Sequence, residues 1–277
     1  MGVSSSKSKT GKSALANKLS QAEKTGILNI ADSDLKANSQ VWEKLETQGI
    51  AERLKTIDVS GNKLKYLPRE ILSMSNLKTL NASRCNIQRT YDMSSLPRLT
   101  TLNMDQNDLE ETTLAQLPST LIKLNIYNNH LINLPPYDIL SNLINLIDIN
   151  ISGNRLTNCN GIGILINIIT INFDNNNITE ISIDIGNCIK LKSISLRNNQ
   201  LSGKNNNSTE QSIPEILFTD TQLDNIILSG NKMLSKSMLY NNFKGIDVFI
   251  ERRKKSKDRN LAGGAASDSD NIFGDLP

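Results

Sequence analysis

The sequence predicts an α/β solenoid, in which short parallel strands stack turn upon turn and helical or extended segments return the chain. An apolar template of the form LxxLxLxxNxL recurs eight times. Its copies begin at Leu54, Leu77, Leu99, Leu121, Leu146, Ile168, Leu191 and Leu223, 22 to 25 residues apart except for a last interval of 32. Aromatic residues make up only 4% of the chain, so Leu and Ile must fill the core.

Each column of the template has a physical role. Two apolar residues two positions apart point one face of a short strand inward, and one turn cannot bury that face alone. The template is that of a leucine-rich repeat, which predicts a right-handed horseshoe with its parallel sheet on the concave face. A polar column should bond the backbone of adjacent turns through its amides. It consists of Asn62, Cys85, Asn107, Asn129, Asn154, Asn176, Asn199 and Asn231, with Cys85 replacing one amide.

The ends of the chain depart from the template. Leu28, Ile30 and Leu35 form a degenerate first unit, and Pro68 suits the first turn of a helical return segment. The expected divisions are a flexible basic segment at 1–12, a cap helix with the degenerate repeat at 13–53, repeats at 54–233, a C-terminal cap and basic helix at 234–257, and a disordered acidic tail at 258–277.

The composition of the chain excludes several classes of function. The net charge of +3 is too small to indicate nucleic acid, and the three cysteines form no close pair for a disulfide framework or a CxxC knuckle. No apolar run has the length of a signal peptide or a transmembrane helix, so we expect a cytoplasmic protein. His130 is the only histidine, and no nucleophile triad or metal site can be assembled. We therefore expect no enzyme activity, cofactor, metal or small-molecule substrate.

The first residues match a lipidation motif. Met1-Gly2-Val3-Ser4-Ser5-Ser6 fits the myristoylation template MGxxx[ST], with Gly2 as the acceptor. One myristoyl chain binds membranes only marginally, and Lys7, Lys9 and Lys12 would supply the second signal. We expect a peripheral association with the inner leaflet of a membrane. The alternative is a Ser-rich terminus that happens to begin with Met-Gly.

Two further basic segments resemble functional motifs less closely than the lipidation motif does. The segment Lys9 to Ser13 (KTGKS) resembles the end of a phosphate-binding loop, but Ser6 stands where that loop needs its first Gly, and no strand precedes it. The run from Arg252 to Arg259 is compatible with a nuclear signal, a membrane contact, a nucleic-acid patch or a solvated helix end. No aromatic residues interleave it, so base stacking and a nucleic-acid partner are not expected.

The outward strand positions are the candidate protein-binding surface. They comprise Asp58, Asn81, Asn103, Lys123, Asn125, Tyr127, Asn150, Asn172, Asp174 and Arg197, with Ser195 and Ile227 completing the central column. Tyr127 and Arg197 are residue types that dominate binding energy at interfaces. The alternative is that these positions are polar only because they are exposed, without a role in binding.

The flanks of the repeats carry a resemblance. Met1-Gly2, QAEKTGILNI (21–30), DTQLDNIILSGN (220–231) and GIDVFIERRKK (245–255) are similar to the leucine-rich repeat-containing protein 57 family, over about residues 1–255. The resemblance implies a lipid-modified cytosolic repeat protein without known enzymatic activity. The Asn-rich insertion near 202–209, the stretch between Ala31 and Glu52, and the acidic tail depart from that family's pattern.

The sequence thus predicts a non-enzymatic scaffold or adaptor, tethered to a membrane and binding a protein on its concave face. One alternative is a regulatory subunit of a phosphatase or small-GTPase signalling complex. Another is a structural role without a defined client.

Overall fold

The computed structural model describes residues 4–202, 212–231 and 234–262. Side chains are described for 14–258 within those ranges, apart from positions 236, 241 and 242. The chain divides into two compact units, residues 1–125 and residues 126–277, and each is described by itself.

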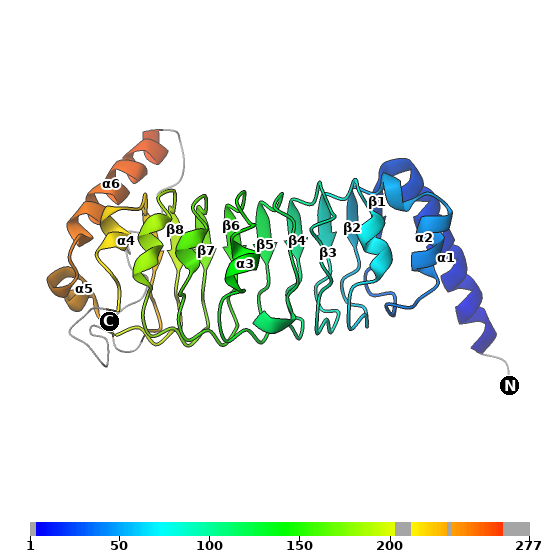
Figure 1. Ribbon diagram of the computed structural model, residues 1–277, viewed down its shortest axis with the longest axis horizontal. Helices are drawn as coiled ribbons and strands as arrows, with labels where there is room; N and C mark the ends of the chain where they lie inside the picture. The colour runs from blue at the N-terminus through cyan, green and yellow to red at the C-terminus, as the bar shows by residue number, and fades with distance from the viewer. Residues whose placement is uncertain (1–3, 203–211, 232–233, 263–277) are drawn as a thin grey trace. The chain divides into compact units, whose positions relative to one another are not determined.

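Unit 1 begins with a helix and continues as turns that each carry one three-residue strand (Figure 1). Its strands are β1 (Ile27–Asn29), β2 (Thr56–Asp58), β3 (Thr79–Asn81), β4 (Thr101–Asn103) and β5 (Lys123–Asn125). They pair in parallel in chain order. The helical segments are α1 (Ser4–Thr25), α2 (Val41–Thr47), η1 (Ala51–Arg53), η2 (Arg69–Ser73) and η3 (Glu111–Thr113).

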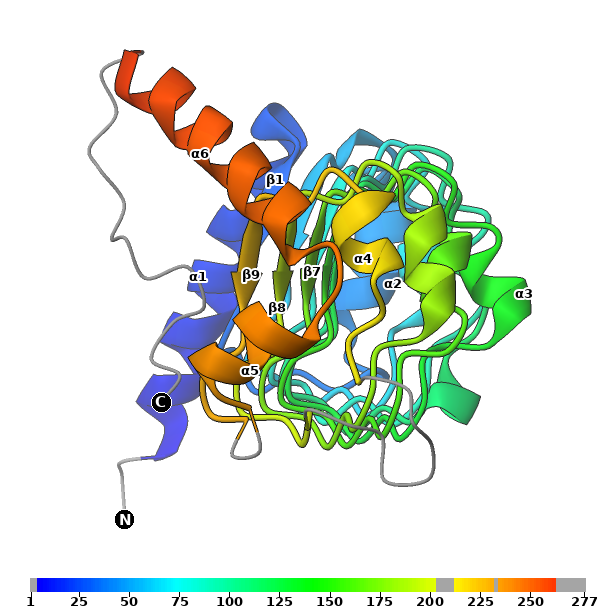
Figure 2. The same ribbon diagram turned by 90° about the vertical axis from the view of Figure 1, so that its left-hand side faces the viewer.

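Unit 2 repeats the plan and ends with helices. Its strands are β6 (Asp148–Asn150), β7 (Thr170–Asn172), β8 (Ser193–Ser195) and β9 (Asn225–Ile227), again parallel and in chain order. Its return segments are α3 (Tyr137–Leu140), η4 (Ile162–Ile164), η5 (Ile183–Asn187) and α4 (Ile216–Thr219), followed by α5 (Lys236–Asn242) and α6 (Ile246–Ala262). Figure 2 shows α6 beside the edge strand β9, and α4 packs against α6.

The register of the strands confirms the repeat template. The middle residue of every strand points inward, so that Ile57 pairs with Leu80 and Ile171 with Ile194 in neighbouring strands, all four fully buried. The outer residues of each strand stay partly exposed. We call the surface formed by these outer residues, and by the residue two places after each strand, the strand face. The degenerate first unit is a true turn, because β1 pairs with β2.

The two terminal helices differ in length from the expected caps. Helix α1 begins at Ser4 rather than Ser13, so residues 4–12, expected to be flexible, have helical backbone. Ser and Lys tolerate a helix, and no proline interrupts the segment. Leu19 and Ala22 are buried, as expected for a cap helix packed against β1. Helix α6 continues to Ala262, past the expected end of the basic helix at Lys257. The rest of the expected acidic tail, 263–277, lies outside the described residues.

Candidate protein-binding faces

The buried polar column joins each turn to the one before it. Asn154 shows the pattern: its side-chain oxygen accepts the N–H of Leu131, and its nitrogen donates to the carbonyls of Ile126 and Ile151, each at 3.0 Å. One amide thus satisfies backbone groups from two successive turns that are hidden from water. Bonds of the same kind are made by Asn62, Asn107, Asn176, Asn199 and Asn231.

Cys85 can replace only half of this function. Its thiol donates to the carbonyls of Val59 and Ser83, at 3.1 and 3.3 Å, but it has no amide oxygen to offer the preceding turn. There, Leu64 and Lys65 donate their N–H groups to the backbone carbonyl of Cys85 instead. Asn129, also buried, donates to the carbonyls of Ile126 and Tyr127.

The Asn and Asp side chains at the strand ends are bonded to their own chain. The side-chain oxygen of Asn150 accepts the N–H of Ser152, two residues later, at 3.1 Å. Asp58, Asn81, Asn103 and Asn172 accept equivalent bonds from Ser60, Ser83, Asp105 and Asp174. These are Asx turns, which reverse the chain as it leaves the strand. This part of the expected binding surface therefore has a structural role.

Asp174 serves the neighbouring turn as well. Its carboxylate accepts the hydroxyl of Ser195 and, at 2.7 Å, the N–H of Arg197. Ser195 stands where β6 and β7 have Asn150 and Asn172, and the carboxylate of Asp174, from one turn earlier, accepts the N–H that an Asn at this place would accept. The Arg197 Nε in turn donates to the hydroxyl of Ser229 at 3.1 Å, while the side chain remains exposed.

Tyr127 is held by close packing on Gly153. A β-carbon on Gly153, whose φ is +66°, would lie only 2.8 Å from the Tyr127 Cε2. The ring thus lies over a backbone position that only glycine leaves open. The structure brings Tyr127, Asn150, Asn172, Asp174 and Arg197 onto the strand face of unit 2, and Asp58, Asn81, Asn103, Lys123 and Asn125 onto that of unit 1.

The cysteine thiols are buried in the core. Burial raises the pKa of Cys85 to about 11 and those of Cys159 and Cys188 to about 12. At neutral pH these thiols stay protonated, and the thiolate is the nucleophilic form. Among the described residues, no group of three or more His, Cys, Asp or Glu side chains could hold a metal ion.

The basic run of α6 is part of the C-terminal cap, and the sequence did not indicate that its arginines bond the backbone of the last turn. Arg252 donates to the carbonyls of Leu223 and Phe218, at 2.8 and 3.0 Å, and Arg253 donates to the carbonyl of Asp224. The edge strand β9 follows directly, so these guanidinium groups bond the last turn of the stack. Lys254 and Lys255 are exposed.

The N-terminal motifs fall on helix α1 and on the residues before it. Lys7, Lys9 and Lys12 lie in helix α1, and Gly2 lies outside the described residues. The KTGKS segment is helical throughout, whereas a phosphate-binding loop must leave a strand before its helix begins. In the described part of the chain, no helix is both long and apolar enough to cross a membrane.

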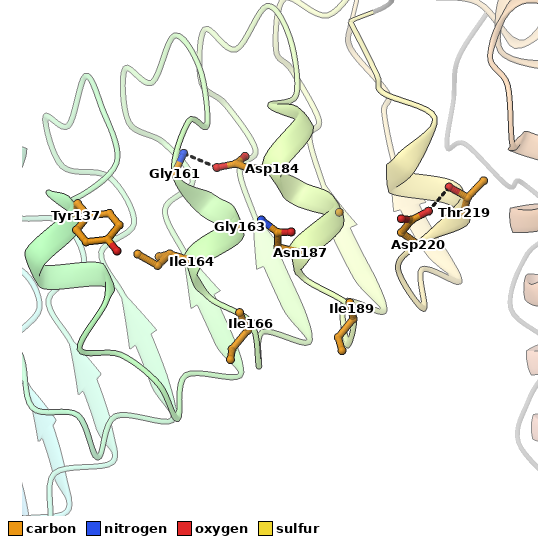
Figure 3. A pocket seen from close by; sticks show the side chains of 11 residues that line it. Tyr137, Gly161, Gly163, Ile164, Ile166, Asp184, Asn187, Ile189, Thr219 and Asp220 are labelled. Atoms are coloured by element: carbon orange, nitrogen blue, oxygen red, sulfur yellow. Dashed lines mark hydrogen bonds between the residues drawn. The ribbon is translucent and has the colours of Figure 1, made fainter.

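A groove on the opposite side of unit 2 was not expected from the sequence. It runs over the helical segments α3, η4, η5 and α4, with Tyr137, Ile164, Ile166 and Ile189 among its lining residues (Figure 3). Asp184 accepts the N–H of Gly161 at 2.8 Å within it, and Asp220 accepts the hydroxyl of Thr219 at one end. We call this surface the helical side.

Solved structures with the same fold identify the architecture. A leucine-rich-repeat protein of Leptospira interrogans matches with 26% identity and a TM-score of 0.56, over 79% of this chain and 49% of that one. An internalin of Listeria monocytogenes matches with 22% identity and a TM-score of 0.56, over 82% of this chain and 62% of that one. The chain folds as a leucine-rich-repeat solenoid. It spans about half to three fifths of the length of these two proteins.

No protein-family model matches the chain, and no curated protein matches it. The narrower resemblance to the leucine-rich repeat-containing protein 57 family therefore stays a prediction.

Proposed function

We propose that this chain is a non-enzymatic scaffold that binds a protein partner on its strand face. The observation that carries the proposal is the fixed geometry of Tyr127 and Arg197 on unit 2. The ring of Tyr127 is seated on Gly153, and Arg197 is bonded through both its backbone N–H and its Nε. Ordering a side chain on binding costs about 0.5–1.5 kcal/mol, so residues that are already ordered bind at lower cost.

The chemistry of the core supports a binding role over a catalytic one. The three thiols are buried and stay protonated at neutral pH. The Asn and Asp side chains at the strand ends accept bonds from their own backbone, which favours a rigid polar surface over acid–base chemistry.

The test is crosslinked affinity capture from cells with wild type and with the pair Tyr127→Ala and Arg197→Ala. We expect the double variant to fold normally and to lose its partner. The pair Tyr240→Ala and Lys244→Ala is a matched control, because it removes an exposed Tyr from α5 and an exposed cation from the turn between α5 and α6. Undiminished capture by the strand-face variant would refute the assignment. Enrichment of a phosphatase catalytic subunit or a small GTPase would identify the partner as part of a signalling complex.

We also propose that Gly2 is myristoylated and that the acyl chain tethers the scaffold to a membrane. The support is the MGxxx[ST] start followed by Lys7, Lys9 and Lys12. Metabolic labelling with a myristate analogue should mark wild type and leave Gly2→Ala unlabelled, and only wild type should sediment with membranes. Equal sedimentation of the two proteins would exclude the lipid anchor and leave the scaffold proposal intact.

A further inference from the structure

The helical side of unit 2 exposes large apolar side chains. The exposed fractions are 75% for Tyr137, 57% for Ile144, 54% for Ile166, 73% for Ile183 and 56% for Ile189. Scattered apolar residues are common on protein surfaces, but a continuous row of them usually marks an interaction site.

Three of these residues occupy the same place in successive repeats. Ile144, Ile166 and Ile189 each stand two positions before the first apolar residue of the template. In three preceding repeats that place holds Ser75, Pro97 and Ser119, and in the last repeat it holds Thr221. The fold therefore does not require an apolar side chain there. The isoleucines are a property of these three repeats, which points to a partner of this surface.

Close packing of the helical segments forms the floor of the groove. A β-carbon on Gly163 would overlap the backbone carbonyl of Asp184, and one on Gly186 would lie 2.5 Å from the Ile216 Cδ1. The two glycines let η4, η5 and α4 approach one another closely. The backbone of these segments forms the base of the groove, and Ile166 and Ile189 line it (Figure 3).

The charged residues that line the groove have a single sign, and the nearby cation Lys190 is bonded to the side chain of Asn167 at 2.7 Å. Among the described residues that line the groove, the charged ones are Asp184 and Asp220, and both are acidic. An apolar row beside carboxylates complements a segment that carries apolar side chains together with Lys or Arg. It opposes an anionic membrane or a nucleic acid. A second copy of this chain, docked face to face, would bring like charges together.

We propose that the helical side of unit 2 is a second docking surface, which takes a partner protein segment that combines aliphatic or aromatic side chains with Lys or Arg. The segment places its apolar side chains against Tyr137, Ile166 and Ile189, and its cations toward Asp184 and Asp220. This surface is distinct from the strand face, so one scaffold can hold two partners.

The test is selection from a random peptide library displayed on phage, using the full chain with Gly2→Ala so that no acyl chain contributes. Ile166→Ser with Ile189→Ser installs the residue that equivalent repeats carry at Ser75 and Ser119, at exposed positions that the fold tolerates. Ile27→Ser is the matched control, because Ile27 is 57% exposed but belongs to unit 1. Affinities are then measured by fluorescence anisotropy of the labelled peptides.

We expect the peptides enriched on wild type to join apolar residues with Lys or Arg. Ile166→Ser with Ile189→Ser should weaken peptide binding about tenfold or more, because the apolar area that the two isoleucines bury against the peptide is lost. Asp220→Asn should weaken peptide binding about threefold, and added salt should weaken binding to the wild type in the same way. Ile27→Ser should bind like wild type.

Three outcomes would overturn the proposal. The first is enrichment of acidic or uncharged peptides, or of peptides that bind the double Ser variant equally well. The second is sedimentation with phosphatidylserine vesicles that the double Ser variant loses, which would assign the surface to a membrane. The third is self-association that the same variant abolishes, which would assign it to a second copy.

Discussion

A single buried amide has a structural role that an aliphatic side chain of similar size cannot replace. Asn154→Leu would leave the N–H of Leu131 without its partner, whereas the carbonyls of Ile126 and Ile151 would each lose one of two side-chain donors and keep the other, from Asn129 and Asn176. Buried groups without a hydrogen-bond partner cost about 1–3 kcal/mol each, so we expect the free energy of unfolding to fall by at least that amount. Urea denaturation followed by circular dichroism measures it.

Asn177→Leu is the matched control, because Asn177 is exposed in the turn that follows. It should change the free energy of unfolding by less than about 0.5 kcal/mol. Equal losses for the two variants would show that the buried column does not carry the bonds described.

The three thiols should be unreactive until the chain opens. With the pKa of Cys85 raised to about 11 and those of Cys159 and Cys188 to about 12, the folded thiols stay protonated at pH 8. Labelling by a thiol reagent at pH 8 should be slow in buffer and fast in urea. A thiol that reacts rapidly in the native protein would contradict this burial.

The same shifts predict how stability depends on pH. Above about pH 9, the ordinary pKa of a thiol, the unfolded chain loses thiol protons that the folded chain retains. The unfolded state then binds fewer protons, so the contribution of these groups to stability falls as pH rises from about 9 toward 11–12. Below pH 9 they contribute no pH dependence. Cys85→Ala should flatten this decline in urea denaturation measured across that range.

The sequence predicted the residues of the Asn column, but it did not show that the strand-end Asn and Asp side chains also bond their own backbone. The column follows from the template, because the spacing places each Asn at a buried corner. Strand alternation points Asn150 and Asp58 outward and so predicts that they contribute to a binding surface. Alternation does not show that each side chain turns back to the N–H two residues later. The signal was available in the pairs Asp58–Ser60 and Asn150–Ser152, which have the spacing of an Asx turn.

At the scale of elements, helix α6 closes the stack through its arginines. Arg252→Ala removes the donors to the carbonyls of Leu223 and Phe218. Hydrogen bonds to a charged group contribute about 1.5–3 kcal/mol, so the last turn should open more readily by about that amount. Native-state hydrogen exchange should show lost protection in β9, with β7 unchanged. Lys254→Ala, on the exposed side of the same helix, should alter neither strand.

Elements within the repeats were easier to predict than those at the ends. An inner strand of either unit is fixed by three apolar positions and a paired strand on each side, which leaves little freedom of register. Helix α1 packs against β1 at the end of the stack, and the run of Ser at positions 4–6 offers several possible starts, so residue type did not single out Ser4. The apolar groove escaped the sequence analysis for a different reason. The template says nothing about positions such as Ile166 and Ile189, and only the structure shows that they remain exposed.

For the whole molecule, the period of the sequence determined the class of fold, because apolar turns of this length bury their faces only by stacking. The choice of partner depends on exposed residues, which the period does not constrain. The proposed membrane attachment would depend on the N-terminal segment, outside the repeats.

The lysines that follow Gly2 would strengthen the proposed membrane attachment. A myristoyl chain alone gives a partition constant of about 10⁴ M⁻¹, and each lysine near an anionic leaflet adds about 1 kcal/mol. Together, Lys7, Lys9 and Lys12 would add about 3 kcal/mol, or roughly a hundredfold. Their backbone is helical from Ser4, so Lys12 lies about 12 Å along the helix axis from that residue. The attraction decays over about 8 Å at physiological salt.

If α1 points away from the leaflet, Lys7→Gln should therefore reduce vesicle binding more than Lys9→Gln, and Lys12→Gln should reduce it least. The triple variant should keep its acyl chain but bind vesicles containing phosphatidylserine about a hundredfold more weakly. Vesicles without charged lipid should bind wild type and the triple variant equally. Vesicle sedimentation of the acylated proteins measures all of these effects. Equal losses of vesicle binding in the three single variants would show that the helix lies along the membrane surface. Unchanged vesicle binding of the triple variant would show that the lysines do not contribute to the anchor.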